Sequence, residues 1–332
     1  MKKVLCMLLA VAMLALPMAG CTSGGSGTPS SEANASEGGS TTAKKGPIAI
    51  VVPSADHGWL AGVAYFAEQK CKELGLEEGT GYKLVTSANV NEQANQIDEM
   101  ISLGASAIVL QPHNDEVSVA AQKIVDAKIP LIVFDRKVNV DYTAYVAGDN
   151  PDMGTRSAEY MGDKLGGKGT IAVLNVPSSG SVSTDRVDSF KKVMSEKYPE
   201  IKLVDFTADD FTQQSGLKTA TDMLTANKSV DAVYSIDDES SLGILQAIKD
   251  ANRTDVKYIS GGGGGQAYFQ KIQGETQPEC FTATYSPSMI KDAIQIAQNI
   301  ADGKSVDKDN IVPPTIVTKE NVGDFLDANS PY

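Results

Sequence analysis

The side chains with the most chemistry in this sequence stand directly after predicted strands. Short β-branched runs end at groups of polar and aromatic residues, which are Ser54, Asp56, His57 and Trp59, then Asp135 and Arg136, and then Asp237 and Asp238. An indole ring can cover the apolar face of a sugar ring, whereas carboxylates and guanidinium groups bond its hydroxyls. The set therefore indicates a binding site for an uncharged polyhydroxyl compound.

Two of these groups also have a simpler interpretation. Trp59 is the only tryptophan, and it opens a predicted helix, where core packing is the alternative. Asp135 and Arg136 follow the apolar run Leu131–Phe134, and a surface ion pair of little energetic worth is their alternative. Ligands of open parallel sheets lie beyond the carboxyl ends of the strands, so the position of these residues favours binding.

Arg186 and Asp237 stand at the starts of predicted helices. The helix macrodipole disfavours a cation such as Arg186 there, so a ligand hydroxyl or a carboxylate partner is needed to explain it. Local pairing with Asp185 or Asp188 is the alternative. Asp237 is in a position typical of a helix cap, which leaves it free to face a ligand as well.

The sequence carries no signature of an enzyme. It contains no Gly-x-Ser-x-Gly elbow, no metal-type cluster of histidine and cysteine, and only two histidines, His57 and His113. The run Gly261–Gly265 is followed by no Lys-Ser or Lys-Thr, so it predicts close backbone approach or hinge freedom rather than phosphate binding. We expect a binding protein without catalytic residues, cofactor or metal.

The elements that must position these residues alternate between strand and helix. Strands are predicted at 48–53, 83–87, 107–111, 131–135 and 145–149, and then at 170–175, 202–207, 232–236, 258–261, 281–285 and 315–317. Helices are predicted near 59–74, 91–103, 115–127, 151–165, 185–197, 213–226, 240–251 and 287–302. Two series of βαβ units predict two doubly wound parallel sheets, and the chain left over after both predicts a hinge.

The N-terminus predicts export and lipid attachment. Residues 1–20 combine two lysines, an apolar run too short to span a bilayer, and small residues, as in a signal peptide. The stretch 16–21 resembles a bacterial lipoprotein cleavage motif with Cys21 as the lipidated residue, and an incidental cysteine is the alternative. Residues 21–46, rich in Ser, Gly and Thr, predict a flexible linker.

The net charge argues against one class of partner, and the position of Cys71 argues against a disulfide. The formal net charge of −13 argues against nucleic acid, which needs a basic footprint. Cys71 falls on the apolar stripe of a predicted helix, which favours a buried thiol over a disulfide with Cys280.

The order of these landmarks resembles the ribose-binding protein family, the type I periplasmic sugar-binding proteins. The matching pieces, spread over about residues 48–318, are Ile129–Arg136, Gly148–Asn150, Leu165–Gly169, Asp185–Arg186, Asp237–Glu239 and Leu242–Gly243. The resemblance implies two Rossmann-like lobes, with hinge crossings near residues 148, 285 and 312. Residues 47–148 with 286–312 would form the N-terminal lobe, and residues 149–285 with 313–332 the C-terminal lobe.

The resemblance also implies roles for single residues. Asp135, Arg136 and Arg186 would hold sugar hydroxyls, whereas Trp59 and Phe211 would be the stacking aromatics. The other residues of the predicted site are Asp56, His57, Asp237 and Tyr285, of which His57 and Asp237 stand where the family often has asparagines. Tyr285 replaces a usual glutamine and Gly261–Gly265 replaces Gly-Phe-Asp-Gly-Thr, so a hexose, a polyol or a larger glycoside is expected rather than ribose.

The function that follows is an extracytoplasmic solute-binding protein that delivers a small sugar or polyol to an ABC permease. We expect a monomer that is held at the outer side of the cytoplasmic membrane or in the periplasm by its lipid anchor alone. A lipoprotein that presents the sugar to a chemotaxis or kinase receptor is the main alternative. A sugar-responsive repressor would need a basic helix-turn-helix N-terminus, and an exported hydrolase would need turnover of its ligand.

Overall fold

The computed structural model describes residues 46–274 and 276–332. The predicted signal peptide, the lipidated Cys21 and the linker as far as Lys45 lie outside the described residues. No helix within the described ranges combines the length and the hydropathy of a membrane span.

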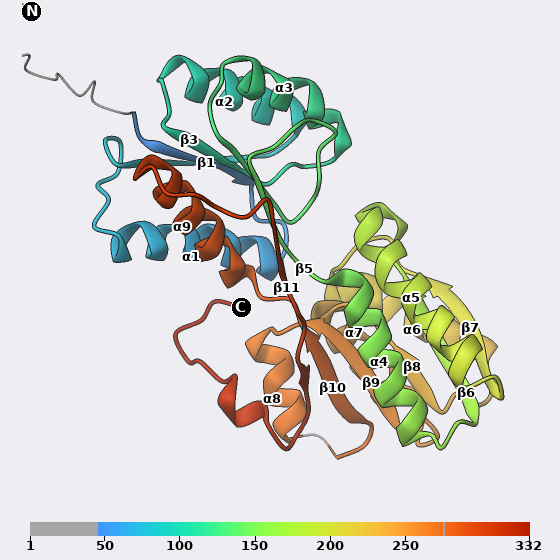
Figure 1. Ribbon diagram of the computed structural model, residues 1–332. Coiled ribbons are helices and arrows are strands. Elements are labelled where there is room, and N and C mark those ends of the chain that lie inside the picture. The colour runs from blue at the N-terminus through green and yellow to red at the C-terminus, as the bar shows by residue number, and fades with distance from the viewer. Residues whose placement is uncertain (1–45, 275) are drawn as a thin grey trace, which may run out of the picture. The chain divides into compact units, whose positions relative to one another are not determined.

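Two six-stranded sheets form the framework (Figure 1). The first has the order β11-β5-β4-β3-β1-β2, all parallel, with β1 (Ile48–Pro53), β2 (Tyr82–Ser87), β3 (Ala107–Leu110), β4 (Leu131–Phe134), β5 (Ala144–Gly148) and β11 (Asp309–Val312). The second has the order β12-β10-β9-β8-β6-β7, with β6 (Gly169–Asn175), β7 (Ile201–Thr207), β8 (Ala232–Tyr234), β9 (Tyr258–Gly263), β10 (Glu279–Thr284) and β12 (Ile316–Val317). Only the short β12 runs antiparallel, against β10. The predicted pair of doubly wound α/β sheets is confirmed.

Helices cover both faces of the first sheet because its strands are apolar on both sides. Alternate residues of β1 enter different cores: Ile48, Ile50 and Val52 pack with α1 (Gly58–Glu73) and α9 (Ile290–Ala301). Ala49 and Val51 pack with α2 (Val90–Ser102) and α3 (Ser118–Asp126). An alternation of this kind keeps the strand buried on both faces, as parallel strands usually are.

Five helices accompany the second sheet. They are α4 (Asn150–Lys164), α5 (Ser181–Lys197), α6 (Gln213–Ala226), α7 (Asp238–Asp250) and α8 (Gln266–Gly274). Glycines let them pack closely, since a Cβ at Gly154 of α4 would lie 2.2 Å from the Arg186 carbonyl oxygen of α5. The chain passes between the two sheets after β5, after β10 and between β11 and β12, near the predicted crossings.

Two details differ from the sequence-based expectations, and a third agrees with them. Helix α5 begins at Ser181 rather than near residue 185, so Arg186 lies in its second turn and not at its start. Strand β11 and helix α8 were not predicted. The buried Cys71 thiol that the sequence favoured is confirmed: Cys71 and Cys280 lie in different cores, no disulfide joins them, and burial raises the pKa of the Cys71 thiol to about 12.

Candidate functional site

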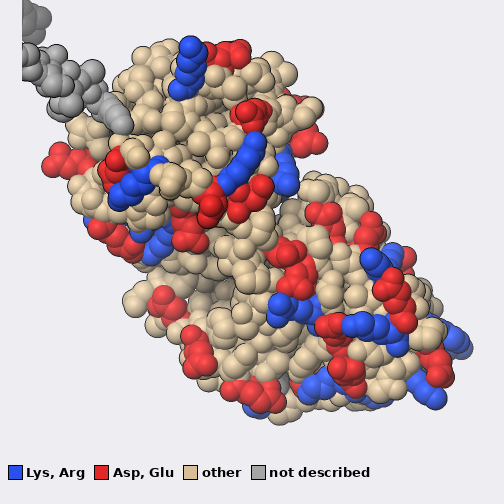
Figure 2. All heavy atoms as spheres, in the orientation of Figure 1, with Lys and Arg blue, Asp and Glu red and all other residues tan. Residues whose placement is uncertain are grey.

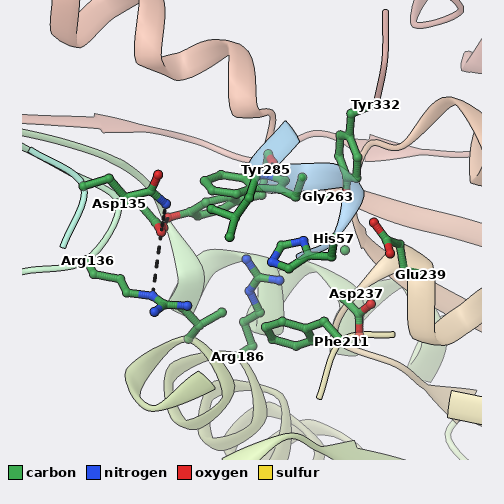
Figure 3. Close-up of a pocket in the computed structure, with 15 residues that line it drawn as sticks. His57, Asp135, Arg136, Arg186, Phe211, Asp237, Glu239, Gly263, Tyr285 and Tyr332 are labelled. Carbon is green, nitrogen blue, oxygen red and sulfur yellow. Dashed lines mark hydrogen bonds and ion pairs between the residues drawn. The ribbon is translucent and has the colours of Figure 1, made fainter. Parts of the chain in front are cut away.

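A pocket gathers side chains that follow the carboxyl ends of strands in both sheets (Figure 3). Its walls are His57, Trp59, Leu60, Gln111, Asp135, Arg136, Val182, Arg186, Phe211, Asp237, Glu239, Gly262, Gly263, Tyr285 and Tyr332. The free cavity is about 60 Å³, which is room for a few water molecules. Aromatic rings and charged groups therefore surround a small space between the two sheets.

Every residue of the predicted binding set lies in this lining except Asp56. The Asp56 side chain is 79% exposed, and its carboxylate lies 3.5 Å from Nε2 of His57. His57 in turn contacts Phe211 edge to face, with the ring centroids 6.4 Å apart. Because Phe211 follows β7 of the second sheet, this contact joins the two sides of the pocket.

Trp59 is held in one orientation by two neighbours. Its ring stacks on Phe134 with an interplanar angle of 5°, and its Nε1 donates a hydrogen bond to the Tyr285 carbonyl oxygen at 2.8 Å. A fixed indole is what a stacking platform for a sugar ring requires, since little entropy is then lost on binding. Trp59 thus packs against the core and lines the pocket at once.

Asp135 is a buried hub and not one half of a surface ion pair. Its Oδ1 accepts a hydrogen bond from the Tyr285 hydroxyl at 2.7 Å, and its Oδ2 accepts from the Gln111 side-chain amide at 3.1 Å. The Arg136 Nε lies 4.0 Å from the same Oδ2 and makes no hydrogen bond to any described residue. The Arg136 Nη1 donates to the His113 carbonyl oxygen, which holds the guanidinium at the pocket wall.

Arg186 is positioned by groups other than its neighbours in sequence. Its Nε donates to Asn150 Oδ1 at 2.8 Å and its Nη1 donates to the Ile236 carbonyl oxygen at 2.7 Å. The guanidinium also lies over the Tyr285 ring, 4.8 Å from the centroid. The alternative of local pairing with Asp185 or Asp188 does not describe this side chain, which is 4% exposed.

Asp237 caps a helix and faces the pocket, as the sequence allowed. Its Oδ1 accepts from the Ser240 backbone N–H at 2.7 Å at the start of α7. Its Oδ2 is buried and has no hydrogen-bond partner among the described residues. Burial raises the pKa of the Asp237 carboxyl to about 7, which the Ser240 hydrogen bonds only partly offset.

Asp238 holds the glycine run in place through backbone hydrogen bonds. Its Oδ2 accepts from the backbone N–H groups of Gly264 and Gly265 at 2.6 and 2.7 Å, and its Oδ1 accepts from the Thr282 hydroxyl at 2.7 Å. A Cβ at Gly261 would lie 2.1 Å from the same Oδ1. Gly261, Gly262 and Gly263 leave no room for a Cβ, so this part of the run serves close backbone approach, which is one of the two roles expected for it.

Three polar members of the lining were missed at the sequence level. Gln111 directly follows β3, where the strand-end rule applied to the other strands would have found it. Glu239 stood out in the sequence only as part of the matching piece Asp237–Glu239, yet its Oε1 accepts from the Gly58 backbone N–H of α1 at 2.7 Å and so joins the two sides. Tyr332 follows no strand or motif, and no sequence signal pointed to it.

A second, larger cavity of about 810 Å³ shares Asp135, Arg136 and Val182 with the pocket. Its other walls are mostly polar or charged, among them Lys137, Asp149, Asn150, Ser179 and Asp185. Aromatic platforms and unpartnered polar atoms are concentrated in the smaller cavity. We therefore take the smaller cavity as the binding pocket and the larger one as its polar mouth.

Known proteins are similar to this chain in sequence. A D-apiose import binding protein of Actinobacillus succinogenes is 31% identical over 221 residues, which cover 64% of this chain and 69% of that protein. The ribose import binding protein RbsB of Salmonella typhimurium is 24% identical over 281 residues, which cover 83% of this chain and 92% of that protein.

A solved structure has the same fold. It is an ABC transporter periplasmic solute binding protein from Actinobacillus succinogenes with bound D-allose, and it aligns with a TM-score of 0.77 at 21% identity, covering 84% of this chain and all of that one. The family model of the periplasmic binding protein domain matches residues 48–305. The resemblance found in the sequence is thus confirmed, and the chain belongs to the periplasmic binding protein family.

Proposed function

We propose that the protein captures a small sugar or sugar-like polyol in the pocket between its sheets and delivers it to the permease of an ABC importer. The observation that supports this most directly is a set of three pocket atoms that lack a hydrogen-bond partner among the described residues. They are the acceptors Asp237 Oδ2 and Gln111 Oε1 and the donor Arg136 Nε.

Unpartnered buried polar atoms are costly, so their convergence on one aromatic pocket points to a ligand that satisfies them. A sugar hydroxyl can both donate and accept, and therefore suits acceptors and donors together. Trp59 and Phe211 would cover the apolar faces of the ring from opposite sides. No net charge is required of the ligand, because carboxylates and guanidinium groups both line the pocket.

The relatives support the choice of ligand class and the absence of catalysis. Their names describe import binding proteins for D-apiose and ribose rather than enzymes. We infer that this chain likewise binds its ligand without converting it, so that the ligand recovered after incubation is chemically unchanged.

Membership of a periplasmic binding protein family implies an exported or periplasmic location. Attachment through lipid on Cys21, the flexible linker after it and a monomeric state belong to the proposal. On the face that Figure 2 displays, acidic and basic side chains are interspersed, which agrees with a protein that does not bind nucleic acid.

The function is tested by a thermal-shift panel of D-ribose, D-apiose, D-allose, xylitol and myo-inositol, because a ligand of the native state raises the melting temperature. The sugar that raises it most is then titrated calorimetrically. If no compound of the panel changes the melting temperature, the proposed ligand class is wrong.

Arg136→Ala should weaken binding of that sugar by about 10- to 100-fold, since a hydrogen bond to a charged group contributes about 1.5 to 3 kcal/mol. The matched control is Arg156→Ala, which removes an exposed arginine that pairs with Asp152 of the same helix. The control should bind as the parent does, and both variants should unfold at similar temperatures. An unchanged affinity in Arg136→Ala would place the ligand elsewhere.

A further inference from the structure

Tyr332 lies in the pocket although it comes fifteen residues after β12, the last strand. The segment that leads to it is fixed to the second sheet and α8. Val322 is buried in that core, and the Phe325 ring lies 5.8 Å from the ring of Phe269. The Gln266 side chain then bonds the Phe325 carbonyl oxygen at 3.1 Å and the Asp327 N–H at 2.8 Å.

Beyond Asp327 the chain reaches α1 of the other lobe. The Tyr65 hydroxyl of α1 donates to the Asn329 carbonyl oxygen at 3.3 Å. The tail therefore connects the two lobes in addition to the three hinge crossings. Its last side chain, Tyr332, stands beside Gly263 and Glu239 at one end of the pocket (Figure 3).

The Tyr332 side chain fills a slot made of glycines from both lobes. A Cβ at Gly263 would lie 2.2 Å from the Tyr332 hydroxyl oxygen, and one at Gly265 would lie 3.4 Å from the ring. On the α1 side, a Cβ at Gly58 would lie 3.3 Å from the ring and one at Gly62 would lie 3.2 Å from the Tyr332 Cβ. The absence of side chains at these four positions leaves the room that the tyrosine occupies.

The hydroxyl of Tyr332 is a donor without a protein partner. It makes no hydrogen bond to any residue that the structure describes, and the Tyr332 side chain is only partly buried, so the hydroxyl is available to a ligand in the pocket. Burial, together with the nearby carboxylates of Asp238, Asp237 and Glu239, raises the pKa of Tyr332 well above its ordinary value. The hydroxyl therefore keeps its proton at physiological pH and can donate a hydrogen bond.

We propose that Tyr332 is a ligand-binding residue that determines which sugars fit, with its ring closing one end of the pocket and its hydroxyl donating to a ligand hydroxyl. The same ligand hydroxyl can donate to the unpartnered Asp237 Oδ2, so each group satisfies the other through the ligand. This inference rests on the proposed function. It adds a size limit, because the tyrosine takes the space into which a longer ligand would extend.

The opposite role for the tail would be that of a plug which the ligand has to displace. The anchoring through Gln266, Phe325 and Tyr65 favours a permanent wall, since displacement would break these contacts. The two roles predict opposite changes in the affinity for a small sugar when the Tyr332 side chain is removed. Removing a wall weakens binding of a small sugar, whereas removing a plug strengthens it.

The experiment titrates the full chain and its variants Tyr332→Phe and Tyr332→Ala with D-ribose, D-allose, xylitol and myo-inositol, and with the disaccharide trehalose as the long probe. Tyr332→Phe should weaken the sugar that binds the parent best by about 5- to 10-fold, through one lost hydrogen bond. Tyr332→Ala should weaken binding of that sugar by about 100-fold or more. The ratio of the affinity for trehalose to the affinity for that sugar should rise in this variant. Tyr142→Phe, whose hydroxyl bonds Asp309 in the N-terminal lobe outside the pocket, is the matched control and should bind as the parent does.

Thermal unfolding of each variant shows whether it is folded at the titration temperature, and Tyr332→Phe decides if Tyr332→Ala is not. The inference is overturned if Tyr332→Phe binds every small sugar within about twofold of the parent, or if either variant binds the parent's best small sugar more tightly than the parent does. A parent that binds none of the five compounds would overturn the sugar-binding function itself, whereas a parent that binds with unaffected variants overturns only the role of Tyr332.

Discussion

At the scale of single residues, the pocket holds the Asp237 carboxyl in surroundings that disfavour its charged form. Burial raises the pKa of the Asp237 carboxyl from 3.8 to about 7, and one of its oxygens has no partner among the described residues. A ligand hydroxyl that donates to Oδ2 stabilises the charged carboxylate and lowers this pKa again. Sugar binding and deprotonation of Asp237 are therefore linked.

We expect sugar affinity to fall as the pH drops from about 8 to about 5.5, because protonated Asp237 has to lose its proton before its Oδ2 accepts a hydrogen bond from the ligand hydroxyl. Calorimetric titrations across this range, in buffers of different ionisation enthalpy, should show proton release on binding. The dependence of sugar affinity on pH should disappear in Asp237→Asn, which removes the titrating group. A pH-independent affinity in the parent protein would contradict this assignment.

The same substitution should stabilise the ligand-free protein. A folded-state pKa above the unfolded value means that the folded state binds the proton more tightly, so stability is lost as the pH rises from about 4 to about 7. Asp237→Asn removes this loss and keeps the Oδ1 cap to Ser240, and should raise the free energy of unfolding at pH 8 by about 1 to 3 kcal/mol. Urea unfolding at pH 4 and pH 8 measures the gain, which should be larger at pH 8.

At the scale of elements, strand ends were the most informative feature of the sequence. Trp59, Asp135 and Asp237 were found because each follows an apolar strand whose carboxyl end must face the pocket. The edge strand β11 was not predicted because Asp309–Val312 alternates exposed and partly buried residues and lacks an apolar run. Helix α5 was placed too late because it starts after Gly180, whose φ of 59° no helix pattern reveals.

The start of α7 shows how one element supports the pocket wall. Asp238→Ala should lower the free energy of unfolding by about 3 kcal/mol, because Gly264 N–H, Gly265 N–H and the Thr282 hydroxyl lose their common acceptor. Urea denaturation measures the loss. Asp250→Ala, at the exposed end of the same helix, is the control and should change stability by less than about 0.5 kcal/mol. Equal stabilities of the two variants would mean that the anchor contributes nothing.

At the scale of the whole molecule, two of the three residues missed in the sequence are ones that join the two lobes. Glu239 bonds Gly58, and Tyr332 reaches across from a tail that follows all strands. Neither contact has a local pattern, since each depends on how the two lobes meet. Sequence periodicity describes one unit at a time, and so it could predict both sheets but not what closes the space between them.

Glu239→Ala should shift the ligand-free protein toward a more open arrangement, because it removes a direct hydrogen bond between the lobes. Small-angle scattering should show a larger radius of gyration, and sugar affinity should fall by about 5- to 10-fold. Glu239→Gln keeps the Oε1 acceptor and should resemble the parent in both measurements. Identical scattering of all three proteins would show that this bond does not hold the lobes together.

Trp59 gives the molecule an optical signal of its own. It is the only tryptophan in the chain, it forms part of the pocket wall, and its indole N–H is bonded to the carbonyl of Tyr285, where the chain crosses between the sheets. Indole emission responds to the polarity and hydrogen bonding of its surroundings. Selective excitation of this one chromophore would therefore follow ligand arrival and hinge motion together in stopped-flow records, without any attached dye.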